Sequence, residues 1–116
     1  MRILVVDDDR AVRDALRRAL TLAGYEVTPA GDGDQALEQV VRSVPDAVVL
    51  DIGLPGVDGY EVARQLRGRG SNARLVALTG YGQPDDVRRA QDAGFNAHLV
   101  KPVDLQRLLR DLAGFE

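Results

Sequence analysis

The stretch AVVLDIGLPGVDG, residues 47–59, places the strongest constraint on how this chain can fold. Four apolar residues, Ala47 to Leu50, lead directly into the acidic residue Asp51, and a loop rich in glycine and proline follows. A short apolar run bounded by turn residues is typical of a strand that is buried on both faces. A carboxylate at the end of such a strand costs free energy unless a cation lies beside it. We therefore expect the rest of the chain to bring a cationic group to Asp51.

Short apolar runs alternate with helical patterns along the whole chain. The strands are predicted at residues 2–6, 25–30, 47–50, 74–79 and 97–100, and the helices at 10–23, 33–43, 60–67, 84–93 and 104–112. Strands that alternate with helices form a parallel sheet that is covered on both faces. The expected fold is an α/β doubly wound, flavodoxin-like domain over residues 1–116, with five parallel strands in the order 2-1-3-4-5 and five helices on two faces.

The spacing of apolar residues predicts which side of each helix faces the sheet. Asp9 is expected to cap the first helix, and Asp32 with Gln35 resembles a capping pair for the second. The predicted inner faces of the second and last helices contain Ala36, Leu37, Val40 and Val41, and Leu105, Leu108, Leu109 and Leu112.

Four of the predicted strands end in residues that can carry chemistry. Asp7 and Asp8 follow the first strand, Asp51 ends the third, Thr79 ends the fourth and Lys101 follows the fifth. In an open α/β sheet, ligands bind beyond the carboxyl ends of the strands, where the strand order reverses. Carboxylates that share a crevice repel one another unless one takes up a proton or a cation binds. Oxygen ligands of this kind suit Mg²⁺.

Such a site can receive a phosphoryl group. Mg²⁺ and Lys101 would neutralise the phosphoryl oxygens, Thr79 would donate a hydrogen bond, and Asp51 could attack phosphorus to form an acyl phosphate. Each residue alone has an ordinary explanation as a cap, a strand end or a surface cation. Their joint placement at one edge of the sheet favours a metal or phosphoryl site.

The composition narrows the class of protein. A net charge of −3 argues against a direct nucleic-acid partner, and no apolar run approaches the length of a membrane span. The absence of cysteine fits the cytoplasm, which is the expected location. Lys101 is the only lysine among the 15 basic residues, and an ammonium does not replace a guanidinium at a tight site.

The motifs ILVVDDD, VVLDIGLPGVDGYE, LVALTGYG and AHLVKPVD together resemble the receiver domains of two-component response regulators, such as the chemotaxis regulator. The last two motifs look most like receivers of hybrid histidine kinases. The resemblance implies that Asp51 is the phosphoacceptor, that Asp8 binds Mg²⁺ directly and that Asp7 binds it through water. Asp51 and the backbone carbonyl of Gly53 would complete the protein ligands.

The resemblance implies further roles. Thr79 would be a switch hydroxyl and Lys101 the ammonium beside the phosphoryl group, with a cis Lys101–Pro102 bond. His98, the only histidine, falls where the family usually has a tyrosine or phenylalanine. It is either a half-buried strand residue or a switch side chain, and we favour the switch. Gly53 would leave the path of water to the acyl phosphate open, whereas Tyr81 would cover it.

The implied function is a phosphoacceptor receiver module of a bacterial phosphorelay. A sensor histidine kinase or a histidine phosphotransfer protein would phosphorylate Asp51 and shift a two-state equilibrium. Output would run through the fourth helix, the fifth strand and the fifth helix. We expect Mg²⁺-dependent autophosphorylation and slow autodephosphorylation, without turnover of a separate substrate. The sequence leaves open whether the chain forms a homodimer, and whether it acts alone or within a longer protein.

Two other functions suit the same topology. A Mg²⁺-dependent phosphohydrolase with an aspartate nucleophile would need a second carboxylate two residues after Asp51, where the chain has Gly53. A nucleotide or flavin carrier would need a glycine- or hydroxyl-rich phosphate loop after the first strand. The chain is acidic there. Turnover of a phosphomonoester would support the first alternative, and absorbance of a bound flavin the second.

Overall fold

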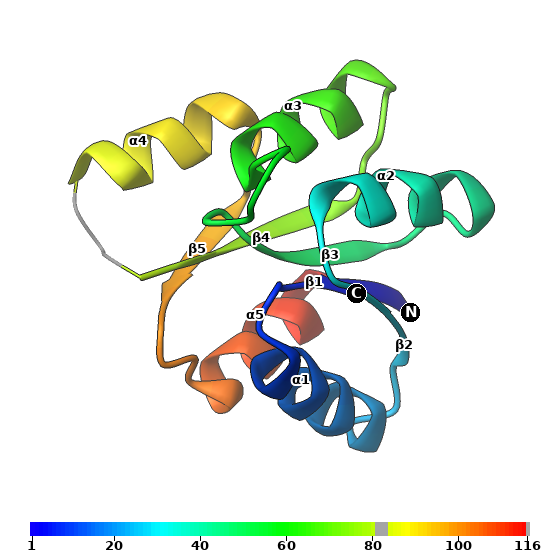
Figure 1. Ribbon diagram of the computed structural model, residues 1–116. Helices are drawn as coiled ribbons and strands as arrows, with labels where there is room; N and C mark the ends of the chain where they lie inside the picture. Colours follow the sequence, from blue (N-terminus) through cyan, green and yellow to red (C-terminus); the bar gives the residue numbers. More distant parts are fainter. Residues whose placement is uncertain (81–83, 116) are drawn as a thin grey trace.

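Apolar segments of the chain form a parallel sheet that organises the molecule (Figure 1). The computed structural model describes residues 1–80 and 84–115. Its elements are β1 (Arg2–Val6), α1 (Arg10–Leu22), β2 (Glu26–Ala30), α2 (Gly33–Arg42), β3 (Ala47–Asp51), α3 (Gly59–Gly68), β4 (Arg74–Thr79), α4 (Pro84–Ala93), β5 (Ala97–Val100) and α5 (Leu105–Phe115). The sheet has five strands in the order β2-β1-β3-β4-β5, which confirms the predicted topology.

The helices cover the sheet on both faces, with α1 and α5 on one side and α2, α3 and α4 on the other (Figure 1). Alternate residues of β3 pack against the helices on opposite sides of the sheet, because successive side chains of a strand point to opposite faces. Val49 packs with Leu16 and Leu108 of α1 and α5, whereas Val48 packs in the cluster that contains Val62 of α3. Within the described ranges, no helix is long and apolar enough to cross a membrane.

One valine and one leucine that were predicted to lie on inner helix faces are exposed. Val41 of α2 is 74% exposed, although Ala36 is fully buried. Successive helix residues turn by about 100°, so Val41 lies about 140° around the axis from Ala36, beyond the edge of the buried stripe. Leu105, the first residue of α5, is 37% exposed, whereas Leu108 and Leu112 are fully buried as predicted.

The loop that follows β3 returns closely onto the start of α3. Gly59 donates a backbone hydrogen bond to the carbonyl of Ile52 at 3.3 Å. A Cβ atom at Gly59 would lie 2.5 Å from the Cα of Ile52, so only glycine permits this approach. Asp58 caps α3 by accepting a hydrogen bond from the backbone N–H of Glu61 at 2.9 Å. These contacts hold in place the loop that follows Asp51.

Candidate phosphoacceptor site

The carboxyl ends of four parallel strands bring the predicted site residues to one edge of the sheet. Asp7 directly follows β1, Asp51 ends β3, Thr79 ends β4 and Lys101 directly follows β5. The strand register pairs Val6 with Leu50, and Thr79 with Val100. Leu50 in turn pairs with Ala77, so the carboxyl ends of these strands lie within two residues of one another along the sheet edge, and the residues at and after them meet in one crevice.

Three neighbouring aspartates after β1 have three different environments. Asp7 is fully buried, and its Oδ1 accepts a hydrogen bond from the backbone N–H of Asp9 at 2.9 Å. Asp8 is exposed. Asp9 caps α1, as predicted, by accepting from the backbone N–H groups of Ala11 and Val12 at 2.9 and 3.4 Å. The cap leaves Asp7 and Asp8 for the crevice.

Asp7, Asp8 and Asp51 form a carboxylate cluster, in which one ligand oxygen of each residue lies within 4.8 Å of the others. Asp51 is only 7% exposed, and its Oδ1 accepts a hydrogen bond from the backbone N–H of Gly53 at 2.9 Å. Like charges at this separation repel one another strongly where water is excluded. The cluster therefore needs nearby positive charge.

Lys101 supplies positive charge to two of these carboxylates. Its Nζ donates a hydrogen bond to Asp51 Oδ2 at 3.0 Å and lies 3.0 Å from Asp7 Oδ2. Burial by itself lowers the pKa of Lys101, but the interactions with Asp51 and Asp7 outweigh it, so the pKa lies above its ordinary value. Lys101 is therefore an ammonium at neutral pH. The predicted cis Lys101–Pro102 peptide bond is present.

The buried carboxyl of Asp7 has unused capacity to bind a cation. Burial raises the pKa of Asp7, and repulsion from Asp51 adds to the rise, while the Asp9 N–H and Lys101 oppose it. Asp7 Oδ2 is buried and accepts no hydrogen bond from the part of the chain that the structure describes, although it lies 3.0 Å from Lys101 Nζ in an ion pair. An oxygen-only donor set with such an acceptor fits Mg²⁺.

A cavity of about 410 Å³ opens over Asp51 and is lined also by Thr79 and Lys101. Thr79 is 2% exposed. The lining of the cavity also includes two side chains that the sequence analysis did not place at this site, Tyr60 of α3 and Arg89 of α4. The sequence gives no signal for them, because Tyr60 and Arg89 lie in helices that begin several residues after the ends of β3 and β4.

His98, to which the resemblance gives a switch role, is not among the described residues that line this cavity. His98 is half-buried on β5, opposite Ala77 in the register, and borders a space of about 30 Å³ beside α4. The structure therefore separates His98 from the carboxylate cluster. Tyr81 lies outside the described residues.

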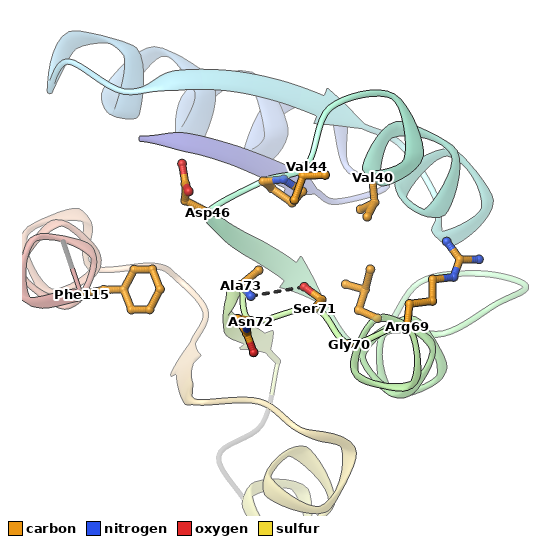
Figure 2. Close-up of a pocket in the computed structure, with 11 residues that line it drawn as sticks. Val40, Val44, Asp46, Arg69, Gly70, Ser71, Asn72, Ala73 and Phe115 are labelled. Atoms are coloured by element: carbon orange, nitrogen blue, oxygen red, sulfur yellow. Dashed lines mark hydrogen bonds between the residues drawn. The ribbon is translucent and has the colours of Figure 1, made fainter.

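A larger cavity, of about 570 Å³, lies at the opposite edge of the sheet, near the amino ends of β3 and β4. Figure 2 shows Val40, Val44 and Arg69 on one side of it and Phe115 on the other. Its carboxylate, Asp46, accepts a hydrogen bond from the backbone N–H of Arg2 at 2.7 Å. That carboxylate has a structural role, so we place the candidate site at the smaller cavity.

Comparison with known proteins agrees with the geometry. Residues 3–113 match the family model described as the response regulator receiver domain. Over 109 residues the chain is 50% identical to response regulator MprA of Mycobacterium leprae, which covers 94% of this chain and 48% of that protein. The chain thus spans about half the length of the curated relatives it matches.

Solved structures show the same fold. A response regulator from Chloroflexus aurantiacus J-10-fl superposes with a TM-score of 0.91 at 34% identity, covering 98% of this chain and 95% of the other. The chemotaxis protein CheY4 of Vibrio cholerae gives a TM-score of 0.93 at 28% identity, covering 99% and 98%. With the sheet order and the acidic crevice, these matches show that the chain belongs to the response regulator receiver domain family.

Proposed function

We propose that Asp51 accepts a phosphoryl group and that residues 1–116 act as a cytoplasmic receiver domain without turnover of a separate substrate. The observation that carries the proposal is the 3.0 Å hydrogen bond from Lys101 Nζ to Asp51 Oδ2 within a cluster of three carboxylates. A structural ion pair would need only one carboxylate. The additional acidic groups and the open cavity suit a site that receives a charged group.

In the proposed reaction, a carboxylate oxygen of Asp51 attacks the phosphorus of the donor. A new P–O bond forms while the donor's P–N or P–O bond breaks, and the leaving imidazole or carboxylate keeps the electron pair. The Gly53 N–H and the Lys101 ammonium hold the carboxylate in place at 2.9 and 3.0 Å. Thr79, in the same cavity, is proposed to donate a hydrogen bond to the transferred group.

We propose Asp7, Asp8, Asp51 and the Gly53 carbonyl as the protein ligands of Mg²⁺. The metal when bound would neutralise charge on the phosphoryl oxygens. Receiver domains bind Mg²⁺ through an acidic pocket, and the Asp7, Asp8 and Asp51 oxygens within 4.8 Å of one another form such a pocket here.

The proposed donor is a phosphohistidine on a sensor histidine kinase or a histidine phosphotransfer protein. An apolar groove of about 500 Å³ lies beside the site, lined by Val12, Ala15, Leu16, Lys101, Pro102, Val103 and Leu105. Lys101 lines both this groove and the cavity over Asp51. We propose that an apolar helix of the donor rests in the groove, because that position brings its histidine next to Asp51.

The proposed output surface consists of α4, β5 and α5. In a homodimer, a second copy of the chain would bind this same surface. Val100 is 43% exposed at the edge strand of this surface. We propose that Thr79 moves toward the phosphoryl group and that His98 follows it inward. The space beside His98 is only about 30 Å³, so its inward movement requires α4 to adjust.

The first prediction concerns Asp51. Incubation with acetyl phosphate and Mg²⁺ should add the mass of one phosphoryl group to the wild-type chain, and none to Asp51→Asn. Intact mass spectrometry measures this, with Asp92→Asn as the control for loss of an exposed carboxyl. Equal labelling of Asp51→Asn would contradict the assignment.

The second prediction concerns the metal. A Mg²⁺ concentration about 100 times Kd should raise the free energy of unfolding of the wild type by about 2.7 kcal/mol. Asp8→Asn should gain much less, and it should be more stable than wild type without Mg²⁺ because one of the mutually repelling charges is gone. Urea unfolding with and without Mg²⁺ tests both effects, and a full Mg²⁺ response in Asp8→Asn would count against Asp8 as a ligand.

The third prediction separates the donor groove from the chemistry. Leu105→Glu should slow transfer from a phosphorylated histidine phosphotransfer protein by about tenfold, as loss of one apolar contact and burial of a charge imply. The rate with acetyl phosphate should not change. Leu22→Glu, at a leucine that is 89% exposed, is the matched control. An equal loss with both donors would show that Leu105 affects the site itself.

The fourth prediction concerns His98. Addition of beryllofluoride, a phosphoryl mimic, with Mg²⁺ should shift the imidazole NMR signals of His98 in the wild type but not in Thr79→Ala. Crystals with and without the mimic should show different His98 rotamers. The same rotamer in both would refute the switch role.

A further inference from the structure

Arg89 lies at the cavity over Asp51 in a position set by an aromatic ring. Its guanidinium carbon is 4.3 Å from the centroid of the Tyr60 ring, and both side chains line that cavity. Tyr60 is only 5% exposed, so the ring is a fixed support rather than a mobile surface group. Among the residues whose side chains the structure describes, no carboxylate forms an ion pair with Arg89.

The stacking leaves the hydrogen-bonding capacity of Arg89 available. A guanidinium that lies over a ring uses its face, whereas its five N–H donors lie in the plane of the group. A planar fork of donors matches the oxygens of a phosphoryl group. Tyr60 also limits the rotamers of a long side chain, which lowers the entropy lost when Arg89 binds an anion.

Phosphorylation creates a need for a further cation at this site. It replaces the single negative charge of Asp51 with a phosphoryl group that carries about −1.5 to −2 near neutral pH. Lys101 already pairs with both Asp7 and Asp51 at 3.0 Å. Arg89 and Lys101 are the basic residues that line the cavity over Asp51 in the part of the chain that the structure describes.

We propose that Arg89, held in place by Tyr60, binds the phosphoryl oxygens of phosphorylated Asp51 and prolongs the lifetime of the acyl phosphate. Water must reach phosphorus to hydrolyse the acyl phosphate, and a guanidinium bound at the open side of the cavity hinders that approach. Gly53 has no side chain to do so. The inference rests on the proposed phosphorylation of Asp51.

The test measures two quantities on the full chain. Wild type, Arg89→Ala, Arg89→Lys and Arg88→Ala are phosphorylated with acetyl phosphate and Mg²⁺, the donor is removed, and the loss of phosphoryl mass is followed. Arg89→Ala should shorten the lifetime by about threefold to fivefold, the range of an exposed ion pair, and Arg89→Lys by less. Arg88→Ala, at an exposed neighbour that does not line the cavity, should match wild type.

The second quantity does not depend on turnover. Titration with beryllofluoride and Mg²⁺, followed by NMR, should show about threefold to fivefold weaker binding for Arg89→Ala. The difference from wild type should shrink at 1 M KCl because salt screens an exposed pair. Equal lifetimes and equal beryllofluoride affinities for Arg89→Ala and Arg88→Ala would overturn the role of Arg89, as would a longer lifetime in Arg89→Ala. A wild type that accepts no phosphoryl group would instead overturn the function proposed for Asp51.

Discussion

The contacts of the Lys101 ammonium with Asp51 and Asp7, each at 3.0 Å, are the interaction on which the functional edge of the sheet depends. Without a cation, two almost fully buried carboxylates would face each other, and an unpaired buried charge costs roughly 3–5 kcal/mol. The surface pair Arg42–Glu38 spans 3.1 Å, yet both side chains are more than half exposed. A pair of that kind contributes only about 0.3–0.5 kcal/mol. Burial, rather than distance, distinguishes the two.

The core and the candidate site occupy different parts of the sheet. The apolar residues of the strands bury both faces, and the acidic residues and the ammonium that form the site lie at the carboxyl ends. At the opposite edge, Arg67 has a structural role: its guanidinium donates to the carbonyls of Gly94 and Ala73 and to Asn96 Oδ1, at 3.0, 2.7 and 2.8 Å. It joins α3 to the chain around β4 and β5, so the strands that present Thr79 and Lys101 are fixed relative to each other.

Periodicity identified the regular elements because each strand and helix carries its own apolar pattern and stop signal. The predicted 74–79 and 97–100 strands match β4 and β5, and the fourth helix matches α4. The same reasoning assigned Val41 and Leu105 to inner faces, and it was wrong there. How far around a helix burial extends depends on where the sheet ends beneath it, and a local pattern holds no information on that boundary. Arg67 had no local signal either, because its acceptors come from distant segments.

The amino-acid sequence by itself determined the α/β class, the strand order and the set of acidic, hydroxyl and ammonium groups at one sheet edge. These follow from short-range patterns together with the general rule that the carboxyl ends of parallel strands lie at the same edge of a sheet. Only the tertiary structure decided that Asp7 is buried while Asp8 is exposed, that His98 lies away from the carboxylates, and that Tyr60 holds Arg89 at the cavity. Each of these depends on how helices pack against the sheet, and packing is a property of residue pairs that are far apart in the chain.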